Sequence, residues 1–260
     1  MPQNSPVAAT ALMAISDAMR NVTNNLANYN TTAYKSSELE FADLTYQSSQ
    51  RLGITATDGV PNMIQLGRGV TVSSITKNFA QGPLNKADSP YHIAIDGIGF
   101  ISVILPDGRI AYTRNGALSR NNLGRIVASD KYELEAQIEI PLESKDLTIA
   151  EDGQVWVTLP NQQEPQPVGQ ILLTRFINPA GLEAIGDNLY MPTDASGDPQ
   201  EGTANEDNYG KIRQYFLEGS NVNSIKALLS MLDLQQIHSM VLNCLNGGYQ
   251  AEKGLIEIKV

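Results

Sequence analysis

The sequence has little of what most catalytic and metal-binding sites require. It contains one cysteine, Cys244, which excludes an internal disulfide, and two histidines, His92 and His238, too few for a zinc site. Scarce cysteine also suits a protein that works outside the cytoplasm without disulfides. No stretch approaches the roughly 20 apolar residues of a membrane span, so we expect no membrane insertion.

Sequence motifs of catalysis are missing as well. No nucleophile-elbow or phosphate-loop pattern occurs. Gly97-Ile98-Gly99 lacks the third glycine of a dinucleotide loop, so a β-bulge or tight bend is expected there. No carboxylate pair can be nominated for acid/base work, although an acidic β-rich carbohydrate enzyme could hide its pair from sequence. We assign structural roles to His92 and His238, and expect no catalytic, cofactor-binding or metal-binding residues.

Positive charge is also scarce. Lys and Arg number 18 against 28 Asp and Glu, for a net charge of -10, which argues against nucleic acid as a partner. The acids lie mostly in the middle, so the near-neutral ends could approach copies of themselves at little Coulomb cost. Ordinary uneven surface charge is the alternative. The N-terminus has no basic region followed by an apolar core, so no cleavable secretory signal is expected.

Apolar residues are abundant, at 42% of the chain, and they form two helical seams near its ends. The N-terminal seam is Ala8, Leu12, Ile15, Met19, Val22 and Leu26, and the C-terminal seam is Ala227, Met231, Leu234, His238, Val241 and Leu245. Both repeat at spacings of 4, 3, 4, 3 and 4, the pattern of a coiled-coil helix that faces a partner. We predict that nine of these residues carry self-assembly: Leu12, Ile15, Met19, Val22, Leu26, Met231, Leu234, Val241 and Leu245.

Capping residues set the expected ends of both helices. Ser5-Pro6 is a favourable start and the first helix should run to about Ala27. Asn221 or Asn223 should cap the second helix, and Gly247-Gly248 should end it. The tail from Leu255 to Val260 has the pattern of a strand.

The middle of the chain predicts many short strands. Turns at Pro106-Asp107-Gly108 and Asp152-Gly153 should join two hairpins, over 100–113 and 147–159. Further strands are expected over 70–75, 92–95, 169–176 and 215–217, and surface loops over 160–167 and 192–210. Residues 48–69 hold several Gly and Pro and indicate an extended loop or a long, irregular hairpin.

These patterns define an α+β protein with a mainly antiparallel central β domain. We expect three parts. Residues 1–30 and 221–260 form a helical, coiled-coil-like assembly domain, residues 31–69 an extended connecting segment, and residues 70–220 a β-rich outer domain.

One segment, which begins in the last turn of the first helix, resembles a known family signature. It contains Asn24, Asn25, Leu26, Ala27 and Asn28 and closes on a turn at Lys35. This is similar to the NNLAN and T-x-x-F/Y-K motifs of the bacterial flagellar rod and hook proteins. Further matches lie at 40–47, 66–70, 79–84, 94–100, 105–108, 111–116, 186–190, 196–199 and 217–223, and their order resembles the distal rod proteins most closely.

The resemblance implies a structural subunit rather than an enzyme. Members of that family polymerise helically into a hollow, stiff shaft that transmits torque from the motor to the hook. The expected partners are other copies of the chain, the proximal rod proteins, the hook protein and the surrounding bushing-ring proteins. The expected location is the flagellar basal body, from the periplasm to the outer-membrane level, after export through the flagellar type III apparatus.

Two departures from the family pattern stand out. The family usually has glycine where Ala33 stands, so a turn with positive φ there would cost about 1 kcal/mol or more. The C-terminal helix lacks the family's arginine-aromatic-glutamate run. In rod-type members an insertion corresponding to residues 46–66 is associated with a straight tube, although a flexible surface loop would have the same composition.

Two alternative interpretations of function stay open at this point. The first is a proximal rod or hook subunit of the same axial family. The second is a β-rich carbohydrate-binding or carbohydrate-cleaving protein with a coiled-coil stalk.

Overall fold

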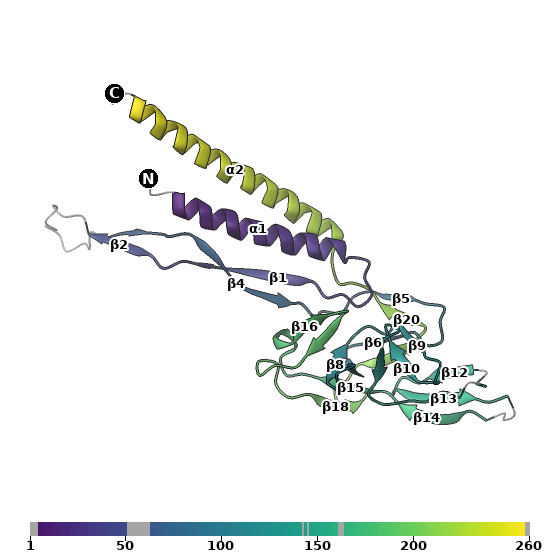
Figure 1. Ribbon diagram of the computed structural model, residues 1–260. Helices are drawn as coiled ribbons and strands as arrows, with labels where there is room; N and C mark the ends of the chain where they lie inside the picture. Colours follow the sequence, from purple (N-terminus) through teal and green to yellow (C-terminus); the bar gives the residue numbers. More distant parts are fainter. Residues whose placement is uncertain (1–4, 51–62, 142, 145, 161–163, 258–260) are drawn as a thin grey trace. The chain divides into compact units, whose positions relative to one another are not determined.

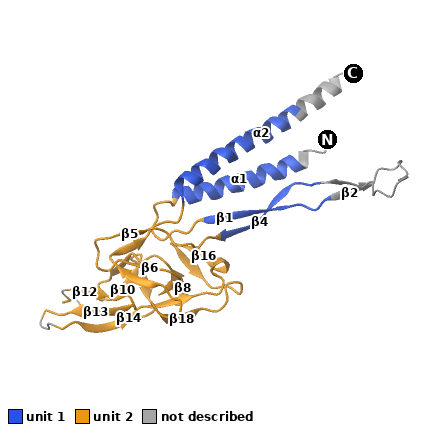
Figure 2. Cartoon of the chain, turned by 180° about the vertical axis from the view of Figure 1, so that it is seen from behind, with its two compact units in different colours: residues 1–27, 37–76, 223–260 blue, residues 28–36, 77–222 orange. Residues whose placement is uncertain are grey.

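The computed structural model describes residues 5–50, 63–141, 143, 144, 146–160 and 164–257. They form an α+β protein with a helix near each end and a mainly antiparallel β region between them, as predicted (Figure 1). The chain divides into two compact units (Figure 2). We call residues 1–27, 37–76 and 223–260 the helical unit, and residues 28–36 and 77–222 the β unit. The three-part division expected from sequence stays a prediction.

The helical unit combines two helices with two small sheets. Helix α1 (Ser5–Ala27) lies beside helix α2 (Ser224–Glu257) and also packs against strand β1 (Ser37–Asp43) (Figure 1). Strand β1 pairs with β4 (Val70–Lys77), and β2 (Gln47–Gln50) pairs antiparallel with β3 (Met63–Leu66). Part of the predicted rod-type insertion, residues 51–62, lies outside the described residues.

Capping residues predicted both ends of helix α1 but not the C-terminal end of helix α2. Helix α1 begins and ends within one residue of the predicted bounds. The predicted stop at Gly247-Gly248 is wrong, because α2 continues to Glu257. Glycine in a helix interior costs about 1 kcal/mol but removes no hydrogen bond, so a helix can cross it. The predicted strand from Leu255 is wrong for residues 255–257, which are helical, and residues 258–260 lie outside the described part.

The β unit is built from short strands. Its strands are β5 (Leu84–Lys86), β6 (Ile93–Asp96), β7 (Phe100–Ile104), β8 (Ile110–Thr113), β9 (Leu118–Arg120), β10 (Ile126–Ala128), β11 (Tyr132–Leu134), β12 (Asp146–Ile149), β13 (Gln154–Thr158), β14 (Gln166–Gln170), β15 (Leu172–Arg175), β16 (Glu183–Gly186), β17 (Leu189–Met191), β18 (Gln200–Thr203), β19 (Lys211–Gln214) and β20 (Phe216–Glu218). A 3-10 turn spans Pro179–Gly181.

Antiparallel pairing organises these strands into one large sheet and three smaller ones. The large sheet has the order β16-β17-β8-β7-β11-β10-β9, with β15 also on β7 and β18 on β15. The smaller sheets are β12-β13-β14, β19-β6 and β20-β5. Buried aliphatic side chains from β6, β7, β8 and β13 form the main core. A second cluster is aromatic, and its rings meet edge to face: Phe79, Phe100, Tyr112, Phe176 and Tyr190.

The two predicted hairpins are confirmed. Strands β7 and β8 pair antiparallel across a turn in which Gly108 has a φ of +84°. Strands β12 and β13 pair in the same way across Gly153, with a φ of +86°. Glycine supplies this left-handed backbone at little steric cost, which is why both turns were recognisable from sequence.

Other β predictions need correction. The single strand expected over 169–176 is two strands, β14 and β15, which separate at Ile171 and join different sheets. The loop expected over 192–210 contains β18, which pairs with β15. In both cases the deciding contacts come from strands distant in sequence, and local composition does not report them.

Candidate assembly site

The C-terminal seam lies on one face of α2. Between Ile225 and Gly247 the half-buried residues are Ser230 and the six seam positions Ala227, Met231, Leu234, His238, Val241 and Leu245. The remaining positions in that stretch are exposed. Because α1 is the main neighbour of α2, this seam faces α1.

The N-terminal seam is also covered within the chain. Ile15 is buried, and Leu12, Met19, Val22 and Leu26 are half-buried, on a helix that contacts both α2 and β1. The structure therefore gathers the predicted assembly residues into the helical unit, where they contribute to packing inside one chain. Their role in contacts between chains stays a prediction.

Sequence reasoning missed a second apolar surface on α2. We call it the outer strip, and its residues are Ile225, Leu228, Leu229, Leu232 and Met240. Their exposed fractions run from 48% to 70%. Spacings of 3, 4 and 8 residues keep them on one helix face, about half a turn from the seam. The same spacing rule that found the seam could have found this strip.

Asn25 of the family motif and Asn21 connect α1 to β1. The Asn25 side chain donates to the Ser37 carbonyl at 2.8 Å and accepts from the Ser37 N–H at 2.9 Å. Asn21, one helical turn earlier, donates to the same carbonyl at 2.9 Å. A paired donor and acceptor is what an amide side chain supplies, which explains asparagine at this point of the motif.

The turn after α1 belongs to the β unit and holds Ala33 in a left-handed conformation. Ala33 has a φ of +57° and no exposed surface, and its N–H donates to the Glu218 carbonyl at 2.8 Å. Before it, Asn28 accepts from both the backbone N–H and the hydroxyl of Thr31, at 3.1 Å each. The positive φ expected from the family's usual glycine is thus confirmed.

Lys35, the last residue of the motif, enters a buried ion cluster with Glu218 and Arg114. Lys35 Nζ lies 2.6 Å from Glu218 Oε1, and Arg114 Nε lies 2.8 Å from Glu218 Oε2. Lys35 and Glu218 side chains have no exposed surface, and that of Arg114 is 4% exposed. Arg114 also donates to the carbonyls of Gly99 and Gly97, at 2.9 and 3.0 Å.

The cluster changes the proton affinity of its members. Burial would raise the pKa of the Glu218 carboxyl, but the Arg114 and Lys35 cations and their hydrogen bonds hold it below its ordinary value. Burial, with the nearby Arg114 cation, lowers the pKa of the Lys35 ammonium against the attraction of Glu218. The carboxylate is therefore the group on which the charge balance of the cluster depends.

Asn221, three residues after Glu218, forms hydrogen bonds to segments near the same ion cluster. Its Oδ1 accepts from the Ser36 N–H at 2.8 Å, and its Nδ2 donates to the carbonyls of Asn78 and Ala80 at 2.8 and 3.1 Å. The sequence named Lys35 as a motif residue and Asn221 or Asn223 as the cap of the second helix. Asn223 is the cap, because its Oδ1 accepts from the Lys226 N–H at 3.0 Å. The sequence placed Arg114 and Glu218 within family-motif ranges but assigned neither of them a role, although an isolated charge in an apolar strand pattern was an available signal.

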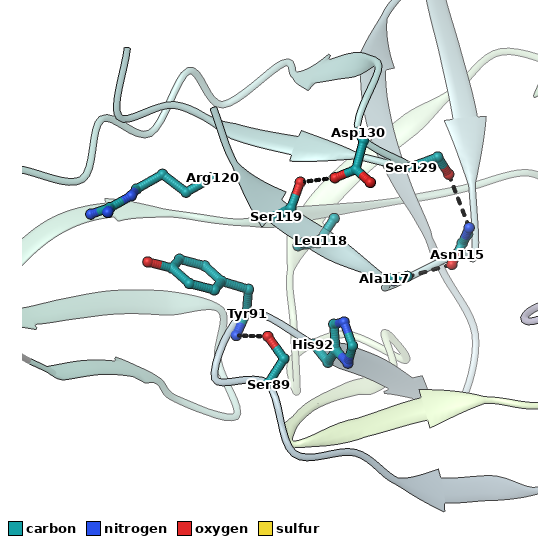
Figure 3. A pocket seen from close by; sticks show the side chains of 10 residues that line it. All are labelled: Ser89, Tyr91, His92, Asn115, Ala117, Leu118, Ser119, Arg120, Ser129 and Asp130. Atoms are coloured by element: carbon teal, nitrogen blue, oxygen red, sulfur yellow. Dashed lines mark hydrogen bonds between the residues drawn. The ribbon is translucent and has the colours of Figure 1, made fainter. Parts of the chain in front are cut away.

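A hollow of the β unit is lined by both polar and apolar side chains (Figure 3). It has a volume of about 610 Å³ and is lined by residues that include Ser89, His92, Asn115 and Asp130. Asn115 donates to the Ser129 hydroxyl at 3.0 Å, and His92 Nδ1 is buried without a hydrogen-bond partner. These groups form no nucleophile-base pair.

Among the residues that the structure describes, no group of three or more His, Cys, Asp or Glu side chains could hold a metal ion. Within the same residues, neither helix is both long and apolar enough to cross a membrane.

Comparisons with known proteins define the class of protein first. Residues 94–157 match the family described as "Flagellar hook protein FlgE/F/G D1 domain". That segment contains Arg114 and the β7–β8 hairpin, so this part of the β unit is similar to a domain of the flagellar hook and rod proteins.

Relatives of known identity then narrow the family. The flagellar basal-body rod protein FlgG of Caulobacter vibrioides is 40% identical over 222 residues, which are 84% of this chain and 85% of the relative. FlgG of Buchnera aphidicola from Schizaphis graminum is 37% identical over 97% of this chain and 98% of its own. The rod protein FlgF of Caulobacter vibrioides is 28% identical over 91% of this chain. The chain belongs to the FlgG family of flagellar basal-body rod proteins.

Proposed function

We propose that this chain is a structural subunit of the flagellar distal rod. Copies polymerise helically into a hollow, stiff shaft in the basal body that transmits torque from the motor to the hook. The observation that carries the proposal is the outer strip of α2, together with membership of the FlgG family. The greater identity to FlgG than to FlgF relatives favours this function over that of another axial subunit.

The outer strip needs a cover that its own unit does not supply. Five large apolar side chains, each between 48% and 70% exposed, lie on one helix face. Fully burying one such side chain contributes roughly 1.5–3 kcal/mol, so covering five contributes several kcal/mol per contact. A contiguous exposed strip of this kind is typical of an interaction surface. We infer that helices of neighbouring copies cover it, in a coiled-coil-like bundle.

The contacts between copies are heterologous. The outer strip of one copy contacts a different surface of the next copy. One such surface is a predicted assembly seam of the next copy, which a small shift of the helix that carries it would expose. Heterologous contacts that do not close a ring generate a helical filament, as a shaft requires. Strands β1, β2 and β3 belong to the proposed connecting segment 31–69, which braces neighbouring subunits and carries the rod-type insertion. The β-rich domain, residues 70–220, faces outward.

The neighbours of such a polymer follow from its position. At its ends we place the proximal rod proteins and the hook protein, and around it the bushing-ring proteins. The subunit is exported through the flagellar type III apparatus to the basal body, where it spans from the periplasm to the outer-membrane level. It acts by assembly and mechanical stiffness, without a cofactor or catalytic step.

A single substitution tests the assembly contact. Leu229→Glu puts a charge in the centre of the outer strip, where the side chain is 58% exposed, so the free chain should fold as before. Losing the contact and burying the charge should raise the critical concentration for polymerisation about tenfold or more, measured by sedimentation.

The matched control is Gln235→Glu, which adds the same charge at an exposed position on the flank of the same helix. It should polymerise like the natural chain. Equal critical concentrations for the two variants would contradict the proposed role of the outer strip.

A further inference from the structure

Three of the four connections between the two units have their last β-unit residues close together. Residues 36, 77 and 222 are the β-unit residues at which these connections begin or end. Beside them, Asn221 bonds the Ser36 N–H and the carbonyls of Asn78 and Ala80. The Asn78 N–H donates in turn to the Ser36 carbonyl at 2.8 Å. One amide side chain thus bridges three segments that are distant in sequence.

The ion cluster bridges the same segments a short distance further into the β unit. Glu218 Oε1 accepts from both Lys35 Nζ and the Gly82 N–H, at 2.6 and 2.9 Å. The Ala80 carbonyl accepts from Lys35 Nζ at 2.8 Å as well as from Asn221 Nδ2. The two centres therefore share an acceptor and act on one group of segments.

Close backbone contact leaves these segments no room to shift. A Cβ at Gly82 would lie 2.1 Å from the Gly219 carbonyl oxygen, so only glycine fits between the two segments. The Gly219 N–H donates to the Pro83 carbonyl at 2.7 Å. A slip of one segment by one residue would break these bonds and leave the Glu218 carboxylate buried without its cations.

Stability alone does not explain a buried ion cluster at this place. Apolar side chains of similar volume usually stabilise a buried site as well or better, because they carry no desolvation cost. Directional bonds to three segments instead favour one register over its neighbours, which is the best-attested use of buried polar groups.

We propose that Glu218 and Asn221 form a clamp that fixes the register of segments 33–36, 78–82 and 218–221. The clamp holds the three connections in one arrangement where they leave the β unit. It does not depend on polymerisation. In a torque-transmitting shaft the clamp would make these connections resist twisting. This consequence rests on the proposed function.

Backbone hydrogen exchange in the full-length monomer tests the clamp. In Asn221→Ala, the amides of Ala33, Asn78 and Gly219 should exchange about tenfold faster or more. Amides that join β7 to β8 should keep their natural rates. Exposed Asn122→Ala is the matched control and should change neither set. Unchanged rates in the clamp, or equal acceleration in β7 and β8, would overturn the proposal.

A second variant separates register from stability. The triple change Lys35→Met, Arg114→Met and Glu218→Leu replaces the ion cluster with apolar side chains. The clamp predicts a melting temperature close to that of the natural chain, with the same local acceleration at Ala33 and Gly219. Natural exchange rates in this variant would contradict it. Because both measurements use the monomer, their failure is distinguishable from a failure to polymerise.

Discussion

Ala33 adopts a left-handed backbone conformation that suits glycine better than alanine. Its φ of +57° is a conformation that costs an alanine about 1–2 kcal/mol, and the residue is fully buried. The bond from its N–H to the Glu218 carbonyl holds the turn in place. The chain carries this strain where the resembled family usually has glycine.

Substitutions at Ala33 should therefore behave asymmetrically. Ala33→Val puts a β-branched side chain at positive φ with no free space, and should lower the free energy of unfolding by about 3 kcal/mol or more. Ala33→Gly removes the strain but loses a buried methyl group worth about 0.8 kcal/mol and gains unfolded-state entropy, so it should stay within about 1 kcal/mol of the natural chain. Urea denaturation of the monomer measures both. Equal losses for the two variants would contradict the strain.

Glu218 should make the largest single contribution to the pH dependence of the β unit. In Glu218→Gln the Lys35 and Arg114 cations stay buried without a counter-charge, which should cost about 3–5 kcal/mol near neutral pH. The natural carboxyl has a lowered pKa, so its contribution is present above the unfolded value of about 4.3 and is lost as pH falls through the folded pKa.

The measurement is the difference in unfolding free energy between the natural chain and Glu218→Gln at several pH values. We expect this difference to be constant from about pH 7 to pH 5 and to shrink below about pH 4. A difference that grows on acidification would contradict the assigned charge state.

Lys35 and Glu218 also mark the limit of sequence reasoning at this scale. Lys35 was identified through a local motif. Its carboxylate partner lies 183 positions away, and no periodicity or spacing connects the two. The roles of residues that pair over long sequence distances follow only from the three-dimensional structure, which brings their strands together.

At the scale of elements, local signals predicted what local interactions determine. The start and end of α1 and the two Gly-containing hairpins were found from sequence, because caps and turns depend on neighbouring residues. Strands β9, β10, β11, β16 and β17 were missed. They are three or four residues long, and pairing across the sheet stabilises them more than their own composition does.

Helix α2 shows both the value and the error of a local rule. Its seam positions share one helix face, and every one of them is half-buried. Its end was not predicted correctly, because glycine lowers helix propensity without forbidding the helix and Gly247 keeps a helical backbone.

At the scale of the whole molecule, the two units differ in net charge. The β unit holds twenty Asp and Glu against twelve Lys and Arg, and the helical unit holds eight against six. The helical unit is therefore nearly neutral, and apolar burial rather than ion pairing should dominate its contacts with other copies. Family membership was predictable because motifs occur along nearly the whole chain. The outer strip, which we propose joins the copies, was missed although helical spacing alone could have located it.

The central claim, that the terminal helices assemble the shaft, is tested most directly by removing them. We would compare the full chain with a chain lacking residues 1–27 and 223–260, which keeps the whole β unit with Ala33 and Asn221. Circular dichroism and β7–β8 hydrogen exchange should confirm that this unit stays folded. Under electron microscopy the full chain should form tubes and the shortened chain none at any concentration. Tubes of equal length from both chains would contradict the account.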